Sequence, residues 1–190
     1  MSHTGDYMAE TARVIQAIPE ADIDGLIGAM TAAWREGRRI FLCGNGGSGS
    51  LCTHAACDFN KGCSLPGKPR MKVISLSDNL AAIMAYANDV CYEDIFVEQM
   101  VNLFEPGDLV IGVSGSGNSE NVYRALAYAR EHGGVTGGLF GYGGGRCRAL
   151  CDHPIVADTF DMQHAEDAHL VLVHLFMKLL VRKAAAGDVG

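Results

Sequence analysis

The chain has 190 residues, of which 48% are hydrophobic and 19% are charged, a composition typical of one globular domain with a sizeable core. Its formal net charge of −7, with no cluster of lysine and arginine to offset it, argues against a nucleic-acid partner. The most apolar run, residues 170–181, is too short to cross a membrane and contains a histidine and a lysine, so no membrane partner is expected.

The seven cysteines argue for reduced thiols. Their odd number, together with a polar and acidic amino terminus that does not look like a signal peptide, predicts a cytoplasmic protein without a disulfide framework. Cys147 and Cys151 are four residues apart with no second pair at the spacing of a zinc ribbon. We therefore interpret the cysteines as small buried side chains.

Predicted helices and strands alternate along the chain. Two amphipathic helices, broken at Pro19, come first and form a separate segment, residues 1–37, which we expect to pack in an oligomer. The remaining residues, 38–190, form the main domain. Strands are predicted at 39–43, 71–76, 109–113, 135–140 and 153–157, and helices at 7–17, 21–36, 48–60, 79–88, 92–104, 120–132 and 164–183.

The strands are apolar throughout rather than alternating with polar residues. This pattern favours a parallel sheet covered on both faces, and hence an α/β fold in which a five-stranded parallel sheet forms the middle layer of a three-layer αβα sandwich. Ligands of such sheets bind beyond the carboxyl ends of the strands, where the strand order reverses. Two glycine- and serine-rich loops, 44–50 and 114–119, follow predicted strands and mark the expected site.

The first loop, GNGGSG at 44–49, matches the dinucleotide pattern G-x-G-x-x-G only weakly. That pattern requires an acidic residue about twenty positions further on, and Asp78 lies too far along the chain. The phosphate-loop pattern of NTPases is absent, so we expect no nucleotide cofactor. The helix that follows is predicted to begin at Ser48 as its N-cap.

The second loop, SGSGNS at 114–119, supplies three hydroxyl groups at the start of a helix. Hydroxyls and backbone N–H groups at a helix N-terminus form a site for an anion such as a single phosphate. The alternative is that Ser119 only caps helix 120–132 and the glycines only turn the chain. Capping alone does not require three serines, so we favour the phosphate site.

Four motifs together resemble a known family. The stretches CGNGGSGS…THAACDF, AYANDVCYED, GVSGSGNSENV and EDAHLVLVH, in this order over residues 38–182, resemble the sugar isomerase (SIS) domain family and, within it, the phosphoheptose isomerases. The resemblance implies a flavodoxin-like arrangement of the sheet and a homotetramer whose active sites are shared between subunits. It also implies interconversion of an aldose and a ketose phosphate through an enediol, a reaction that needs a base and an acid.

The resemblance also assigns roles to individual residues. The phosphate is expected on the serine loop, the first loop is expected to line the substrate, and an Asn-Asp pair and Glu166 complete the substrate contacts; the loop and pair residues are Asn45, Gly46, Gly47, Ser48, Asn88, Asp89, Ser114, Gly115, Ser116 and Ser119. Asp58 and His174 are expected to be the catalytic pair. One zinc ion per subunit is expected on His54, Asp58, Glu166 and His174.

Two of these positions depart from the family's pattern. Asp58 is one methylene shorter than the expected glutamate, and Glu166 replaces the expected glutamine. His54 and Asp58, four residues apart on a predicted helix, project from one face. A lone pair of this kind is usually a surface contact, and a lone histidine such as His174 in an apolar run is usually a core residue. His169 is left as a core residue or a pocket group.

Three functions therefore remain open. The first is conversion of sedoheptulose 7-phosphate to D-glycero-D-manno-heptose 7-phosphate, and the second is isomerisation of another ketose phosphate. The third is a regulatory protein that binds a sugar phosphate without catalysis, as occurs elsewhere in this fold.

Overall fold

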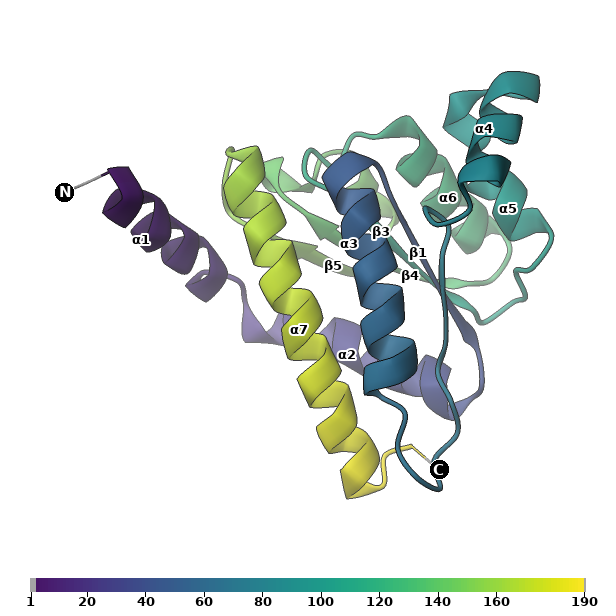
Figure 1. Ribbon diagram of the computed structural model, residues 1–190, viewed down its shortest axis with the longest axis horizontal. Coiled ribbons are helices and arrows are strands. Elements are labelled where there is room, and N and C mark those ends of the chain that lie inside the picture. Colours follow the sequence, from purple (N-terminus) through teal and green to yellow (C-terminus); the bar gives the residue numbers. More distant parts are fainter. Residues whose placement is uncertain (1–2, 190) are drawn as a thin grey trace.

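Five parallel strands in the order β2-β1-β3-β4-β5 form the centre of the computed structural model, which describes residues 3–189 (Figure 1). The predicted α/β class and the five parallel strands are confirmed. The strands are β1 (Arg39–Gly44), β2 (Lys72–Ser75), β3 (Leu109–Ser114), β4 (Val135–Phe140) and β5 (His153–Val156).

Both faces of the sheet are buried. Successive side chains point to opposite sides of each strand, so a strand that is apolar at every position contributes to the cores on both faces. Along β1, Ile40 and Leu42 belong to one core, whereas Phe41 and Cys43 belong to the other. The continuous apolar character of the strand sequences thus reflects two cores rather than one.

Helices complete the other two layers of the sandwich (Figure 1). One core is closed by α2 (Glu20–Arg35), α3 (Gly46–Cys57) and α7 (Met162–Ala186), and the other by α4 (Leu80–Asp89), α5 (Val97–Val101) and α6 (Glu120–Glu131). The first helix, α1 (His3–Gln16), docks on the start of α7, where the Tyr7 hydroxyl donates to Asp167 at 2.7 Å.

The strand order reverses between β1 and β3. The helix that follows β1, α3, covers one face of the sheet, and the helix that follows β3, α6, covers the other. A crevice opens between the carboxyl ends of two strands wherever this happens. The loops 44–50 and 114–119 lie at these two ends, so the predicted location of the site at the switch point agrees with the topology.

Several predicted helices were wrong in extent, since α1 begins at His3 rather than at residue 7 and α7 spans Met162–Ala186 rather than 164–183. Two others differ in a way that bears on the site. The helix predicted at 48–60 begins at Gly46, with Asn45 rather than Ser48 as its N-cap, and ends at Cys57 in a π-helical turn, η1 (Asp58–Gly62). Ser48 lies inside the first turn because the loop bends at Gly46, whose φ of +52° a glycine adopts without strain.

The helix predicted at 92–104 is broken into a 3-10 turn, η2 (Tyr92–Asp94), and the short α5. The Asp94 carboxylate accepts two hydrogen bonds from Arg124 at 3.0 Å, and Ile95 and Phe96 are both buried in the core. These tertiary contacts override the local helical periodicity. Two further 3-10 turns, η3 (Tyr142–Gly144) and η4 (Cys147–Leu150), connect β4 to β5.

The amino-terminal helices are not separate from the main core. Trp34 at the end of α2 is buried and donates from its indole nitrogen to the Pro69 carbonyl at 2.8 Å. The division of the chain at residue 37 stays a prediction. Within residues 3–189, no helix is both long and apolar enough to span a membrane.

Candidate functional site

The serine loop at the end of β3 forms a small cup. Ser114 and Ser119 are joined by a hydrogen bond of 3.0 Å between their hydroxyls, and the amide of Gly117 donates to the Ser114 hydroxyl at 3.2 Å. Ser119 occupies the N-cap position of α6, but its side chain makes no capping hydrogen bond. The Ser119 hydroxyl therefore contacts Ser114 rather than the helix end. Gly115 and Ser116 also line the cup, and the Ser116 hydroxyl accepts from the Asn118 amide at 3.2 Å.

A third glycine-rich loop, residues 141–145, packs against the backbone of the cup. The amide of Gly141 donates to the Gly115 carbonyl at 2.9 Å, and the amide of Cys147 donates to the Gly117 carbonyl at 2.9 Å. Gly117 has a φ of +64°, and a Cβ atom at this position would overlap the Gly144 carbonyl oxygen. Contact between the two backbones therefore fixes the shape of the cup.

The first loop forms the opposite wall. The side chains of Asn45 and Asn121 exchange two hydrogen bonds of 2.8 and 2.9 Å, which join the start of α3 to α6. The Tyr92 hydroxyl also donates to Asn45, at 2.8 Å. Asn45, Gly46, Gly47 and Ser48 line the cup as the resemblance implied, but the Asn45 amide is already engaged by the protein. The contribution of Tyr92 was not predicted, because it depends on a contact across 47 residues.

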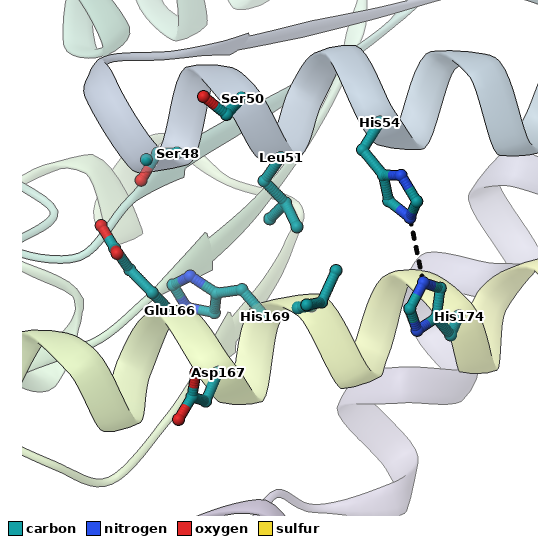
Figure 2. Close-up of a pocket in the computed structure, with 10 residues that line it drawn as sticks. Ser48, Ser50, Leu51, His54, Glu166, Asp167, His169 and His174 are labelled. Carbon is teal, nitrogen blue, oxygen red and sulfur yellow. Dashed lines mark hydrogen bonds between the residues drawn. The ribbon is translucent and has the colours of Figure 1, made fainter.

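Two histidines and one carboxylate converge about two helical turns beyond the cup. His54 lies on α3, His174 on α7, and Asp58 at the start of η1. The Nε2 atoms of His54 and His174 are 2.9 Å apart (Figure 2), and Asp58 Oδ2 lies 3.4 Å from the first and 3.9 Å from the second. One ligand atom from each residue lies within 4.8 Å of the other two. Imidazole nitrogens and a carboxylate oxygen are ligands that zinc accepts, so the donor set fits the implied metal.

Glu166 is not part of this group. Its carboxylate lies against Gly47 at the start of α3, where a Cβ atom on Gly47 would come within 2.8 Å of it. Figure 2 shows the side chain directed toward Ser48, well away from His54 and His174. Its assignment as a fourth metal ligand stays a prediction, and its place beside the cup agrees better with contact to a substrate.

The Asn-Asp pair lies elsewhere, at the carboxyl end of α4. Asn88 donates to the carboxylate of Asp89 at 2.7 Å, and both side chains are exposed. Neither residue lines the cup or the hollow between α3 and α7. Their contact with substrate within one chain is therefore unsupported by this geometry, and a role in a neighbouring subunit's site stays a prediction.

A hollow of about 460 Å³ connects these features between α3 and α7. This is large enough for a small phosphorylated metabolite. It shares residues Gly47, Ser48 and Glu166 with the cup, and it also reaches the histidine pair. Its lining is Gly47, Ser48, Ser50, Leu51, His54, Glu166, Asp167, His169, Leu170 and His174.

His169 forms part of the wall of this hollow (Figure 2) and is only 1% exposed. Burial lowers the pKa of its imidazole to about 4, although the nearby backbone of Phe140 opposes a part of the shift. Neither ring nitrogen makes a well-formed hydrogen bond among the described residues, and the Phe140 backbone is the polar group that acts on the ring. The ring is therefore neutral near pH 7, with one donor and one acceptor of which Phe140 can serve one at most.

Gly117→Ala is expected to damage the cup. The added methyl group would overlap the Gly144 carbonyl, and the left-handed backbone at this position disfavours alanine by about 1 kcal/mol even without the overlap. We expect the dissociation constant for inorganic phosphate, measured by calorimetry, to rise at least about tenfold. The matched control is Gly143→Ala, which has a φ of +72° but open space around its Cβ position. Equal phosphate affinity in the two variants would contradict this role of backbone contact.

The buried His169 makes stability depend on pH. Its folded pKa of about 4 lies below the ordinary value of 6.5, so the unfolded chain takes up the proton first as the pH falls. The free energy of unfolding is therefore expected to lose up to about 3 kcal/mol through this residue between pH 6.5 and pH 4. Urea unfolding of the wild type and His169→Leu should show a smaller loss in the variant. Parallel pH profiles would contradict the assignment.

Comparisons with known proteins agree with this geometry. The model of the SIS domain family matches residues 6–141. A phosphoheptose isomerase from Trichlorobacter lovleyi is 34% identical over 160 residues, covering 84% of this chain and 81% of that protein. Another, from Pelobacter propionicus, is 33% identical over 175 residues, covering 90% of this chain and 92% of that protein.

A solved structure supports the fold independently. A phosphoheptose isomerase from Francisella tularensis superposes with a TM-score of 0.86 and 22% identity, covering 96% of this chain and 100% of that chain. The family match spans more than half of the sequence, and curated relatives above 30% identity are covered over most of their length. The chain belongs to the SIS domain family.

Proposed function

We propose that the chain is an aldose–ketose isomerase of phosphorylated sugars that converts sedoheptulose 7-phosphate to D-glycero-D-manno-heptose 7-phosphate. One observation carries the proposal. The serine cup and the His54–His174 pair, which Asp58 adjoins, line two hollows that share Gly47, Ser48 and Glu166, so one molecule can reach both. The relatives described above are named for an isomerase of a phosphorylated heptose, which agrees with this arrangement.

The phosphate would bind in the cup, where it would be held by the hydroxyls of Ser114, Ser116 and Ser119 and by amides at the start of α6. The sugar chain would then extend along α7 toward the histidine pair. Holding the reacting carbons beside fixed groups supplies a large part of the rate enhancement of such reactions.

The two proton transfers would fall to Asp58 and His174. Asp58 would take a proton from C1 of the ketose, exchange it with solvent, and deliver a proton to C2 of the enediol, so the carboxylate is regenerated. His174 would move a proton between the oxygens on C1 and C2. Asp58 lies beside His54 and His174, which line the hollow, and the substrate would have to reach past these two rings to meet its carboxylate.

His54, Asp58 and His174 would also hold the zinc ion, whereas the Glu166 carboxylate, predicted as the fourth ligand, lies beside Gly47. A bound zinc ion would polarise a substrate oxygen as a Lewis acid.

We further propose a cytoplasmic homotetramer with shared sites. Leu170 and Val171 on α7 are 40% and 43% exposed. Beside them, an apolar groove runs between α7 and the amino-terminal helices, with Ile15, Ile18, Ile23, Leu175 and Leu179 in its lining. Exposed apolar surface of this kind is typical of subunit contacts. In such an assembly Asn88 and Asp89 would serve a neighbouring site.

A second candidate is isomerisation of another ketose phosphate. It is favoured by Glu166, which places a carboxylate beside the cup where the family's pattern has a neutral amide. The candidate that binds a sugar phosphate only for regulation is disfavoured, because the convergence of two histidines and Asp58 is unnecessary for binding alone.

The purified chain is expected to convert sedoheptulose 7-phosphate in D2O into an aldoheptose phosphate that carries deuterium at C2, as detected by proton NMR. Asp58→Asn should reduce turnover at least about 100-fold because the amide cannot accept the proton. The matched control is Asp22→Asn, which changes an exposed carboxylate in the first turn of α2 and should leave turnover at the wild-type rate.

Turnover of a different ketose phosphate alone would select the second candidate. An absence of turnover with any ketose phosphate, in a chain that still binds inorganic phosphate, would overturn the enzymatic proposal in favour of a regulatory one.

Zinc affinity tests whether Glu166 contributes to the metal site together with the three convergent ligands. His54→Ala is expected to raise the zinc dissociation constant at least about tenfold, measured by competition with a chromogenic chelator, because it removes one of three protein ligands. Glu166→Gln should change it far less if the carboxylate stays beside Gly47. His132→Ala, a substitution at an exposed position of α6's end, is the control. Unchanged affinity in His54→Ala would contradict the site.

A further inference from the structure

His169 differs from the other buried histidine of α7. His164 is also buried, but its Nδ1 lies 2.8 Å from the Thr11 hydroxyl and its ring stacks on Tyr7 with centroids 4.3 Å apart. His169, which is more deeply buried, makes no well-formed hydrogen bond at either ring nitrogen, and only the Phe140 backbone acts on it as a weak partner. Among the described residues, only one other buried side-chain atom shares this state, Nε of Arg38.

An imidazole that is buried without a hydrogen-bond partner destabilises the folded chain. Burying a polar group without a hydrogen bond carries a penalty that a leucine of similar volume avoids. The penalty is removed when a ligand supplies the partner. Because His169 lines the hollow between α3 and α7, a ligand bound in this hollow can supply the missing hydrogen bond.

The position of His169 along α7 indicates which part of that ligand it meets. A helix rises about 1.5 Å per residue, so His169 lies about 4.5 Å beyond Glu166, beside the cup, and about 7.5 Å before His174. A chain that is held by its phosphate at the cup and reacts beside His174 passes His169 near its middle. The middle of a sugar phosphate carries hydroxyl groups.

We infer that His169 is a specificity-determining residue that hydrogen-bonds a mid-chain hydroxyl of an open-chain sugar phosphate in this hollow. The inference rests on the proposed function for the class of ligand, but not on turnover. A neutral imidazole offers one donor and one acceptor, and a hydroxyl can complement either. Both nitrogens are covered by protein atoms, so this inference requires the ring to turn about its Cβ–Cγ bond when the ligand binds.

The inference separates recognition of the sugar from recognition of its phosphate. The cup contacts the phosphate through the loop 114–119, which His169 does not join. The histidine pair acts at the other end of the hollow. A change at His169 should therefore weaken binding of a polyol phosphate while leaving the affinity for inorganic phosphate intact.

Calorimetry with two unreactive probes tests this. Inorganic phosphate occupies the cup alone, and D-glucitol 6-phosphate adds a chain of hydroxyls without a carbonyl group to react. For the wild type we expect the second probe to bind at least about tenfold more tightly than the first. His169→Leu should lose about tenfold in affinity for D-glucitol 6-phosphate and bind inorganic phosphate as before. His169→Gln, which keeps a donor and an acceptor, should recover a part of the loss.

Two controls keep a structural role apart from recognition. Urea unfolding at pH 7 reports whether each variant folds, and His132→Gln reports the effect of removing an exposed imidazole. A folded His169→Leu that keeps the wild-type preference for D-glucitol 6-phosphate would overturn the inference. So would an equal loss for both probes, which indicates general damage, or a wild type that binds both probes equally. Because neither probe turns over, these outcomes are distinct from a failure of the isomerase assay.

Discussion

The site depends on the reversal of strand order between β1 and β3. These two strands pair in parallel, with Gly44 opposite Val113, and their following helices leave toward opposite faces of the sheet. The amino ends of α3 and α6 therefore lie beside each other over one crevice. The return of β1 into α3 requires close backbone contact, since a Cβ on Gly44 would come within 2.8 Å of the Ser48 backbone and one on Gly49 within 2.8 Å of the Gly44 carbonyl. The glycines of the dinucleotide-like pattern thus serve the turn, which is why the pattern alone indicates no nucleotide.

Electrostatics at this crevice are unusual for the phosphate site that we propose there. None of the described residues that line the cup is a lysine or an arginine, and one, Glu166, is a carboxylate. Nearby Arg124 and Arg146 are both paired with Glu120 on α6. Recognition of an anion here has to come from hydroxyls and amide dipoles arranged around the start of α6, whose geometry the loop 141–145 holds in place. The overall charge of −7 opposes any anion at long range, so the short-range arrangement of donors decides the affinity.

The features that the sequence predicted are those that local pattern controls. The apolar strands predicted the parallel sheet and the three serines predicted the cup, because both features depend on residues that are neighbours in sequence. The errors arose where distant contacts override local preference. Arg124 holds Asp94 and interrupts the helix predicted at 92–104, and the bend at Gly46 moves the N-cap from Ser48 to Asn45. The convergence of His54 with His174, 120 residues later, was reached through resemblance, since spacing within either helix alone could not place one against the other. His169 stayed ambiguous because a histidine in an apolar run does not show whether its nitrogens find partners.

Alignment of α7 against α3 determines how far apart the ends of the site lie. Glu166, His169 and His174 occupy successive turns of α7 and all line the same hollow. The start of α7 is fixed by Asp161, whose side chain accepts hydrogen bonds from the amides of Gln163 and His164 at 3.0 and 3.2 Å. Close packing also fixes the start of α7. A Cβ atom added to Gly141, in the loop that supports the cup, would lie 2.8 Å from the Cβ of Ala165. Because the same loop contacts both the cup and α7, the anion site and the histidine pair are held in one frame. A shift of α7 by one turn would move His174 about 5.4 Å, roughly four carbons of an extended sugar chain, and would bring a different carbon to His174. The contact of Gly141 with Ala165 therefore bears on which atom reacts, although neither residue touches the substrate hollow.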